Sequence, residues 1–410
     1  MFPRINPATM PDTAHYAGLS LLSLFVFVSP FPHTQTIGEI SFYAALLIFS
    51  YLSLRLGVKI ETYGVWTTLL MFGGWCIVSS VFALDPYESF ADLYSHFAKY
   101  LILTVMLAVF FASRQRLVLL ASVIMYSGVT FALTIMVYFY GVLDNDLTIR
   151  MGLPRWSTNT MGFVFLFSLA LIFPLFRNYK EKLIRYGLFC SAFILIVASL
   201  LTQSRGTFIA LVTMSLVFCY QYRKILVIAM VLLITAGILT PNLSDRFAKS
   251  NKHRTALFLY TVEIIKDFPV TGIGFARDTY RDPAHIDSEI YTARIPKEYR
   301  DAGMFTFPHN MILDVTVKTG LIGTFLFCGF WGMLFLTSFR LLRQTRDRFI
   351  KDWTLTLLAA SVMFAVRGMF EPTTTHFVLT ILHTILAMLI ILLNLQSRSH
   401  DNDINIKSYV

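Results

Sequence analysis

Histidine and arginine side chains stand where polar stretches of this sequence meet apolar ones. His309 lies between Pro308 and a long apolar run, Arg205 lies in the short turn "TQSRG", and Arg254 opens the stretch "RTALFLYTVEIIKDFP". A neutral imidazole accepts a proton near neutral pH, and the planar guanidinium of arginine matches the oxygens of phosphate groups. These residue types predict a site that binds an anionic, phosphate-like group and removes a proton beside it.

The composition assigns these residues to a membrane protein. Of the 410 residues, 56% are hydrophobic and only 14% are charged, and the mean hydropathy is +0.64. A helix needs about 20 apolar residues to cross the hydrocarbon core of a bilayer. We predict an all-α integral membrane protein with about twelve transmembrane helices, near residues 14–32, 38–54, 63–83, 97–113, 117–141, 158–176, 184–201, 205–221, 224–241, 310–339, 353–370 and 376–395.

Basic residues gather in alternate connections between these runs, and they predict the orientation of the chain. One set of connections is rich in lysine and arginine, whereas "ALDPYESFADLYSH" (83–96), in the other set, is acidic. The positive-inside rule assigns the basic set and both termini to the cytoplasm. The net charge of +10 is largely this signal, and it does not indicate nucleic acid as a partner.

One connection is much longer than the others and divides the chain. We predict helices 1–9 in residues 1–241, a large periplasmic loop at 242–309, helices 10–12 at 310–395 and a cytoplasmic tail at 396–410. Loops this long usually have a function or are disordered. This loop is rich in aromatic residues and includes an amphipathic helix at 254–269, so we expect it to be ordered and to cover the membrane surface.

Arginines that the positive-inside rule does not explain gather on the predicted outer side. Besides Arg205 and Arg254, they include Arg367 in "AVRGMFEP" and the pair Arg150 and Arg155 before the sixth span. Arginine is costly near the membrane interior and usually marks a polar cavity or pathway. Several guanidinium groups around one cavity predict a phosphate or pyrophosphate ligand.

Each of these residues also has a structural interpretation. Arg205 can extend its charge to the interface, Arg254 can be an ordinary loop cation, and Arg367 can pair with Glu371. His309 or the neighbouring Asn310 can cap the tenth helix. Two further sets are expected to have no role in ligand binding. Asp314 and Lys318, one helical turn apart, are expected to pair with each other in the first turns of the tenth helix, and the loop arginines Arg150 and Arg155 are expected to be surface charges.

Several cofactor classes lack their sequence signatures. The chain has no HExxH motif and no clustered His/Cys ligand set, so no metal site is predicted. It also has no P-loop or glycine-rich nucleotide motif, which argues against a nucleotide substrate. We therefore expect no cofactor.

The sequence resembles the O-antigen ligase family of Gram-negative bacteria. The resemblance covers the layout of spans and loop and rests on four stretches: "SRG" at 204–206, the residues from Arg254 through "DFPVTGIGF", "PHN" at 308–310 and "VRGMFE" at 366–371. It implies a fold similar to that of the C-type glycosyltransferases. It also implies an inner-membrane enzyme whose active site faces the periplasm.

The resemblance implies roles for particular residues. The enzyme would transfer O-antigen polysaccharide en bloc from undecaprenyl pyrophosphate to a sugar hydroxyl of lipid A–core, with inversion and without metal or nucleotide. Arg205 and Arg254 would hold the pyrophosphate, and His309 would be the base. Arg367 and Arg155 are further candidate substrate-binding residues.

Two other interpretations stay open. An O-antigen polymerase or a protein O-oligosaccharyltransferase would use the same kind of donor with another acceptor, although "PHN" and "VRGMFE" favour the ligase. A transporter or flippase belongs to a different class. It would predict internal repeats, which we do not find in this sequence.

Overall fold

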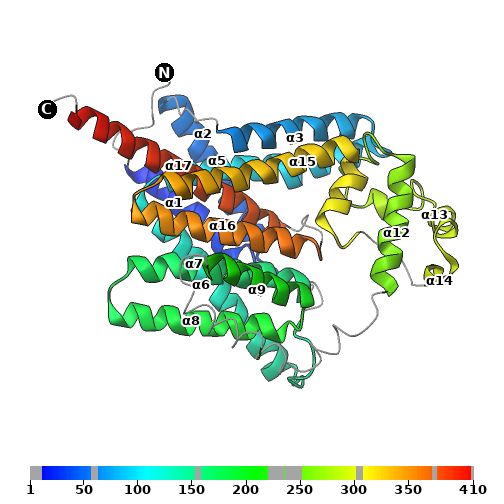
Figure 1. The fold of residues 1–410 in the computed structure, drawn as a ribbon, viewed down its shortest axis with the longest axis horizontal. Helices are drawn as coiled ribbons and strands as arrows, with labels where there is room; N and C mark the ends of the chain where they lie inside the picture. Colours follow the sequence, from blue (N-terminus) through cyan, green and yellow to red (C-terminus); the bar gives the residue numbers. More distant parts are fainter. Residues whose placement is uncertain are drawn as a thin grey trace.

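The structure is a computed structural model that describes residues 12–56, 63–152, 158–219, 235, 252–301, 308–371 and 376–407. These residues form long helices that run side by side, with a smaller helical layer across one end (Figure 1). The bundle contains α1 (Asp12–Val28), α2 (Gln35–Leu56), α3 (Gly64–Val81), α4 (Pro86–Leu93), η2 (Tyr94–Ala98), α5 (Lys99–Phe110), α6 (Arg114–Met136), η3 (Val137–Val142), α7 (Thr158–Asn178), α8 (Lys182–Leu201), α9 (Arg205–Cys219), α15 (Met311–Gln344), α16 (Arg348–Gly368) and α17 (His376–Lys407). The layer contains α12 (Lys252–Asp267), η4 (Thr279–Arg281), α13 (Ser288–Arg294) and α14 (Lys297–Arg300).

Most of the bundle helices are suited to a lipid environment. Within the described part of the chain, nine helices are long and apolar enough to cross a membrane, and α1 and α9 are shorter apolar helices. Every predicted span except 224–241 coincides with a helix, and 224–241 lies outside the described residues. The predicted all-α membrane class is therefore confirmed, whereas the total of twelve spans stays a prediction.

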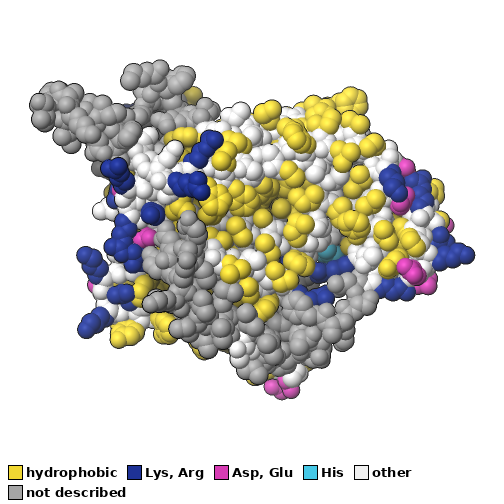
Figure 2. Space-filling model, viewed as in Figure 1, with side chains coloured by type: hydrophobic (Ala, Val, Ile, Leu, Met, Phe, Trp, Pro, Cys, Tyr) yellow, Lys and Arg dark blue, Asp and Glu magenta, His cyan; other side chains and the backbone are white. Residues whose placement is uncertain are grey.

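The helices differ in how they are buried. Most of the described side chains of α7, α16 and α17 are buried, and α16 contacts α7, α9, α15 and α17. By contrast, the peripheral helices expose large apolar side chains such as Leu54, Phe189 and Phe325, and Figure 2 shows a broad apolar face over the bundle. Contact with acyl chains explains such a surface, because the backbone of each helix is already hydrogen-bonded internally. Because α16 contacts four other helices, several helices meet at its end.

The helix α15 is broken at Gly320, and the chain that follows α12 fills the break. Gly320 has a φ of +68° and a ψ of −174°, which are not helical values. The backbone N–H of Ile273 donates to the Val317 carbonyl at 2.9 Å, and a Cβ on Gly320 would lie 1.9 Å from the carbonyl oxygen of Val270. Only glycine has no Cβ and adopts this φ readily. Gly320 therefore allows the main chain of residues 269–274 to form hydrogen bonds directly with the main chain of α15.

The α12 layer has a small core of its own. Leu257, Thr261 and Ile264 are buried along one side of α12, as the amphipathic pattern at 254–269 predicts. The Thr261 hydroxyl forms a hydrogen bond of 2.7 Å with Tyr280, and the carboxylate of Asp267 accepts hydrogen bonds from α13. These charge-assisted bonds lower the pKa of Asp267 and hold α13 against α12.

Basic connections gather at the end of the bundle away from the α12 layer. Arg114, between α5 and α6, pairs with Asp347, which begins α16. Arg177, at the end of α7, lies 3.2 Å from Asp352 in the first turns of α16. Among the described residues, the connections between α5 and α6, between α7 and α8 and between α15 and α16, which the sequence assigns to one side, therefore lie together.

We expect Gly320→Ala to destabilise the protein by about 1–3 kcal/mol, because the new methyl group meets a carbonyl oxygen and the required φ is unfavourable for alanine. Gly329→Ala is the matched control, since it lies in the same helix and its added Cβ would meet nothing within 4 Å. Thermal unfolding of both purified variants in detergent checks the prediction. Equal melting temperatures for the two variants would contradict the proposed packing in the break.

Candidate functional site

The start of α15 is joined to the end of α16 through the side chain of Asn310. Its Oδ1 accepts hydrogen bonds from the backbone N–H groups of Ile312 (2.9 Å) and Leu313 (3.1 Å), so Asn310 caps α15. Its Nδ2 donates to the carbonyl oxygen of Met369, just past α16, at 3.3 Å. One amide therefore satisfies the first turn of α15 and fixes the position of the preceding residue, His309.

His309 contacts Glu371 across the same junction. The Nδ1 atom of His309 lies 3.2 Å from Oε2 of Glu371. The His309 side chain is 30% exposed, whereas that of Glu371 is only 3% exposed. A buried carboxylate thus lies behind an imidazole that reaches the surface. The sequence does not predict this contact, because His309 precedes α15, Glu371 follows α16, and the two residues are 62 positions apart.

The guanidinium of Arg367 is buried in the last turn of α16. The Arg367 side chain is fully buried, and its Cζ lies 5.3 Å from the centre of the Phe163 ring. A Cβ on Gly206 would lie 2.7 Å from its Nη1, and a Cβ on Gly162 would lie 3.2 Å from its Nε. Glycines of α7 and α9 therefore leave the room that Arg367 occupies. Arg367 was expected among the substrate-binding residues, but its guanidinium lies beneath the surface of the site.

The ring of Phe370 connects the start of α12 with the start of α9. The Cζ of Arg254 lies 5.9 Å from the centre of this ring, a distance typical of a cation–π contact. The same ring approaches Gly206, where an added Cβ would lie 2.8 Å away. Because Gly206 follows Arg205, the first residue of α9, Phe370 brings the elements of both arginines to one place. Phe370 belongs to the stretch "VRGMFE", but its apolar side chain gives no signal from which this role could be predicted.

The charges around the end of α16 sum to a positive value. Arg205, Arg254 and Arg367 carry three positive charges, and Glu371 carries one negative charge. Both Glu371 and Arg254 act electrostatically on Arg367. Arg205 also stands at a helix N-terminus, whose backbone N–H groups favour anions. Figure 2 shows basic side chains beside a histidine at the edge of the apolar face. An anionic group at the membrane surface fits this field.

Of the two loop arginines before α7, the described one has a structural role. Nε of Arg150 donates to the carbonyl oxygen of Thr202 at 2.9 Å, and Nε2 of Gln203 donates to that of Thr148 at 3.0 Å. These bonds join the loop before α7 to the turn before α9. Arg150 therefore helps to hold the turn that leads into Arg205. Arg155, the other candidate, lies outside the described residues.

A second polar group lies inside the bundle. The expected pair is present: Asp314 and Lys318 lie 3.2 Å apart, and their side chains are 4% and 5% exposed. With His96 and Phe275 they line a cavity of about 70 Å³ among α3, η2, α15 and α17. The cavity is mostly apolar, and its two opposite charges already satisfy each other. It is separate from the residues at the end of α16.

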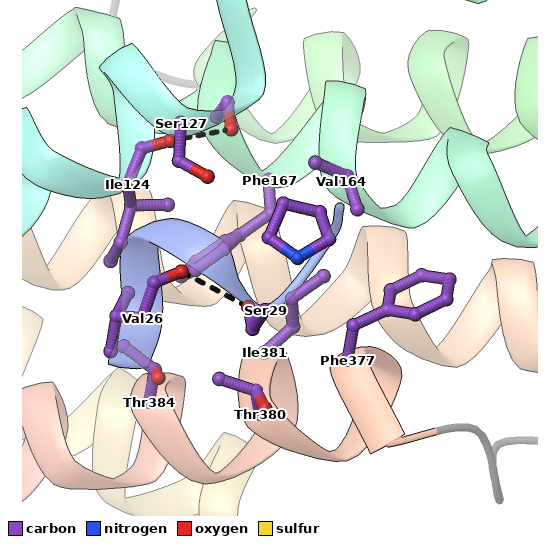
Figure 3. A pocket seen from close by; sticks show the side chains of 12 residues that line it. Val26, Ser29, Ile124, Ser127, Val164, Phe167, Phe377, Thr380, Ile381 and Thr384 are labelled. Carbon is purple, nitrogen blue, oxygen red and sulfur yellow. Dashed lines mark hydrogen bonds between the residues drawn. The ribbon is translucent and has the colours of Figure 1, made fainter. Parts of the chain in front are cut away.

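A smaller cavity of about 30 Å³ lies among α1, α6, α7 and α17 (Figure 3). The hydroxyl of Ser29 donates to the carbonyl oxygen of Val26 at 3.0 Å, and that of Ser127 donates to the carbonyl oxygen of Phe27 at 2.6 Å. The lining contains no charged side chain. Serines that bond to helix carbonyls are a common packing feature in membrane bundles.

In the part of the chain that the structure describes, no group of three or more His, Cys, Asp or Glu side chains is close enough to hold a metal ion. Asp144 and Asp146 form a D-x-D sequence beside η3. The carboxylate of Asp146 accepts a hydrogen bond from the backbone N–H of Thr148 at 2.8 Å, which lowers its pKa. This aspartate stabilises an exposed turn.

Long apolar helices with a cluster of positive charges at one end are typical of a multi-pass membrane protein. The family model described as O-antigen ligase matches residues 190–328. The matched residues are about a third of the chain and include three of the four stretches that carry the resemblance, so the match supports an O-antigen ligase family assignment; "VRGMFE" at 366–371 lies outside it. A multi-pass protein of the inner membrane is consistent with both findings. No individual curated protein matches the sequence.

We expect Gly206→Ala to destabilise the protein by about 1–3 kcal/mol, because the added methyl group displaces the Arg367 guanidinium and the Phe370 ring. The control is Gly187→Ala in α8, where an added Cβ would meet nothing within 4 Å. Melting curves of both variants test the expectation. If Gly206→Ala melts no lower than Gly187→Ala, the tight approach of α9 to α16 is wrong.

Proposed function

We propose that the protein is an O-antigen ligase in lipopolysaccharide biosynthesis. It transfers O-antigen polysaccharide en bloc from undecaprenyl pyrophosphate to a sugar hydroxyl of lipid A–core. One observation carries the proposal. Arg205, Arg254 and His309 all lie within the stretch that matches the family, and the elements that carry them meet at one end of an apolar bundle. A lipid-linked pyrophosphate requires this combination of a positive site and a lipid-facing surface.

Arg205 and Arg254 bind the pyrophosphate of the donor in this proposal. Both side chains are partly exposed, so their guanidinium groups can reach a ligand, and each guanidinium can donate paired hydrogen bonds to phosphate oxygens. The undecaprenyl chain stays in the bilayer against the apolar face. The position of the basic side chains at the edge of that face supports this arrangement (Figure 2).

His309 acts as the base. Its imidazole takes the proton from the acceptor hydroxyl, whose oxygen forms a bond to the anomeric carbon of the donor. The bond between that carbon and the pyrophosphate oxygen breaks, and undecaprenyl pyrophosphate leaves with the bonding electrons. Attack opposite the leaving group inverts the anomeric configuration. The charge that develops on the leaving oxygen is stabilised by Arg205 and Arg254, and one such preorganised donor typically contributes about 10²–10³ in rate.

The proposed reaction occurs on the periplasmic face. The basic connections at the far end of the bundle support this orientation, because cytoplasmic loops are enriched in lysine and arginine. Both termini are then cytoplasmic, and the α12 layer is periplasmic. We also propose that the chemistry needs neither metal nor nucleotide, since fixed guanidinium groups take over the stabilisation of the leaving pyrophosphate.

We expect His309→Ala to reduce the rate of transfer by about 10²–10⁴-fold through loss of the base, and Arg205→Ala to reduce it by about 10²–10³-fold. His33→Asn is the control for the histidine, because His33 is exposed in a turn between α1 and α2 and has a positive φ that asparagine tolerates. Arg281→Ala, in the α12 layer, is the control for the arginine. Normal transfer by folded, membrane-inserted His309→Ala protein would exclude the base assignment.

The acceptor is identified by a transfer assay with purified protein in detergent. The protein receives undecaprenyl-pyrophosphate-linked O-antigen and lipid A–core, with EDTA and without ATP. We expect a ladder of polysaccharide-bearing lipid A–core on a gel. Longer lipid-linked glycans without any transfer to lipid A–core would instead indicate an O-antigen polymerase. Transfer to a protein would indicate an oligosaccharyltransferase, and the absence of all three products would favour a transporter or flippase.

A further inference from the structure

We propose that Glu371 is a positioning residue that sets the orientation and the tautomer of His309. This inference rests on the proposed function for its catalytic consequence, but its structural part concerns the side chains alone. The contact joins Nδ1 of His309 to Oε2 of Glu371 at 3.2 Å. A carboxylate can only accept a hydrogen bond, so Nδ1 carries the proton in neutral His309. The nitrogen that accepts a proton from the substrate is then Nε2.

The burial of Glu371 makes this contact directional. Its side chain is 3% exposed, so few water molecules compete for the carboxylate, and an electrostatic contact away from water is stronger than one in it. The His309 side chain is 30% exposed, and its backbone lies two residues before the start of α15. The Asn310 cap fixes the backbone next to His309, and Glu371 fixes the orientation of the imidazole ring through Nδ1. Two independent anchors therefore hold the base.

Arg367 explains why a buried carboxylate is available for this role. Arg367 stands four residues before Glu371, its guanidinium is fully buried, and the negative charge of Glu371 acts favourably on it. Glu371 therefore interacts with a fixed cation and with the imidazole. When His309 takes a proton from the acceptor, the same carboxylate stabilises the imidazolium. The arrangement has the chemistry of a carboxylate–histidine pair in a hydrolase, in which the acid orients the base and is not itself protonated.

Glu371→Gln tests the proposal because the two side chains have nearly the same shape. In the variant, the positive charge of Arg367 attracts the amide oxygen and leaves the amide NH₂ toward Nδ1. The NH₂ group donates, so it favours the tautomer with the proton on Nε2, which cannot act as the base. We expect kcat to fall by about 10²-fold or more, with a KM for the lipid-linked donor within about threefold of the original, because the pyrophosphate is bound elsewhere.

The tautomer is read directly by nitrogen NMR of protein labelled with ¹⁵N-histidine, in bilayers at alkaline pH. The His309 signals are the ones that disappear in His309→Asn. We expect protonated Nδ1 in the original protein and a shift toward protonated Nε2 in Glu371→Gln. This measurement does not depend on turnover. If the enzyme has another substrate, the proposed function fails while the tautomer result stands.

A double variant separates positioning from simple neutralisation of Arg367. Arg367→Met combined with Glu371→Leu removes both buried charges and leaves no acceptor for the Nδ1 proton, so it also serves if Glu371→Gln alone does not fold. We expect it to lack the Nδ1-protonated signature and to remain at least about 10²-fold slower than the original. Recovery of normal transfer by the double variant would overturn the proposal, and so would an unchanged tautomer and kcat in folded Glu371→Gln.

Discussion

The positive charge of Arg367, buried at one end of a lipid-embedded bundle, is the constraint on which the surrounding structure depends. A buried guanidinium is costly unless a counter-charge and enough space are provided. Glu371 provides the counter-charge, and Gly162 and Gly206 provide the space. The same short segment carries Phe370, which contacts Arg254. Because α7, α9, α12 and α15 all meet this segment, accommodation of one charge fixes the relative positions of four helices.

Two polar groups in this protein show different solutions to the problem of charge near lipid. Asp314 and Lys318 lie one turn apart on α15 and are both buried, so their charges compensate each other locally. At the end of α16 the positive charges outnumber the negative ones, and two of the arginines are partly exposed. The first group is suited to structure. The second keeps an excess of positive charge, which the proposed pyrophosphate leaving group would require.

Much of the fold follows from the sequence, because it depends on local patterns. Apolar runs predict the long helices, the spacing of Leu257, Thr261 and Ile264 predicts α12, and the i, i+4 spacing predicts the Asp314–Lys318 pair. Arg367 and Glu371 are also four residues apart and interact electrostatically, but α16 ends at Gly368, so Glu371 lies outside the helix and its contact with His309 follows from no spacing rule. Contacts between the ends of different helices, including those of Phe370 and Gly206, have no periodicity that could predict them.

The break in α15 separates two parts of the protein that face different demands. At Gly320 the α12 layer is attached through backbone atoms, and the bond from Ile273 to Val317 involves no side chain. Backbone bonds persist when side chains are exchanged. The side chains of residues 277–301 can therefore diversify without displacing Arg254 or His309. The end of α16 and the α12 layer can therefore change independently of each other, which would suit the proposed transfer of glycans that differ in chemistry.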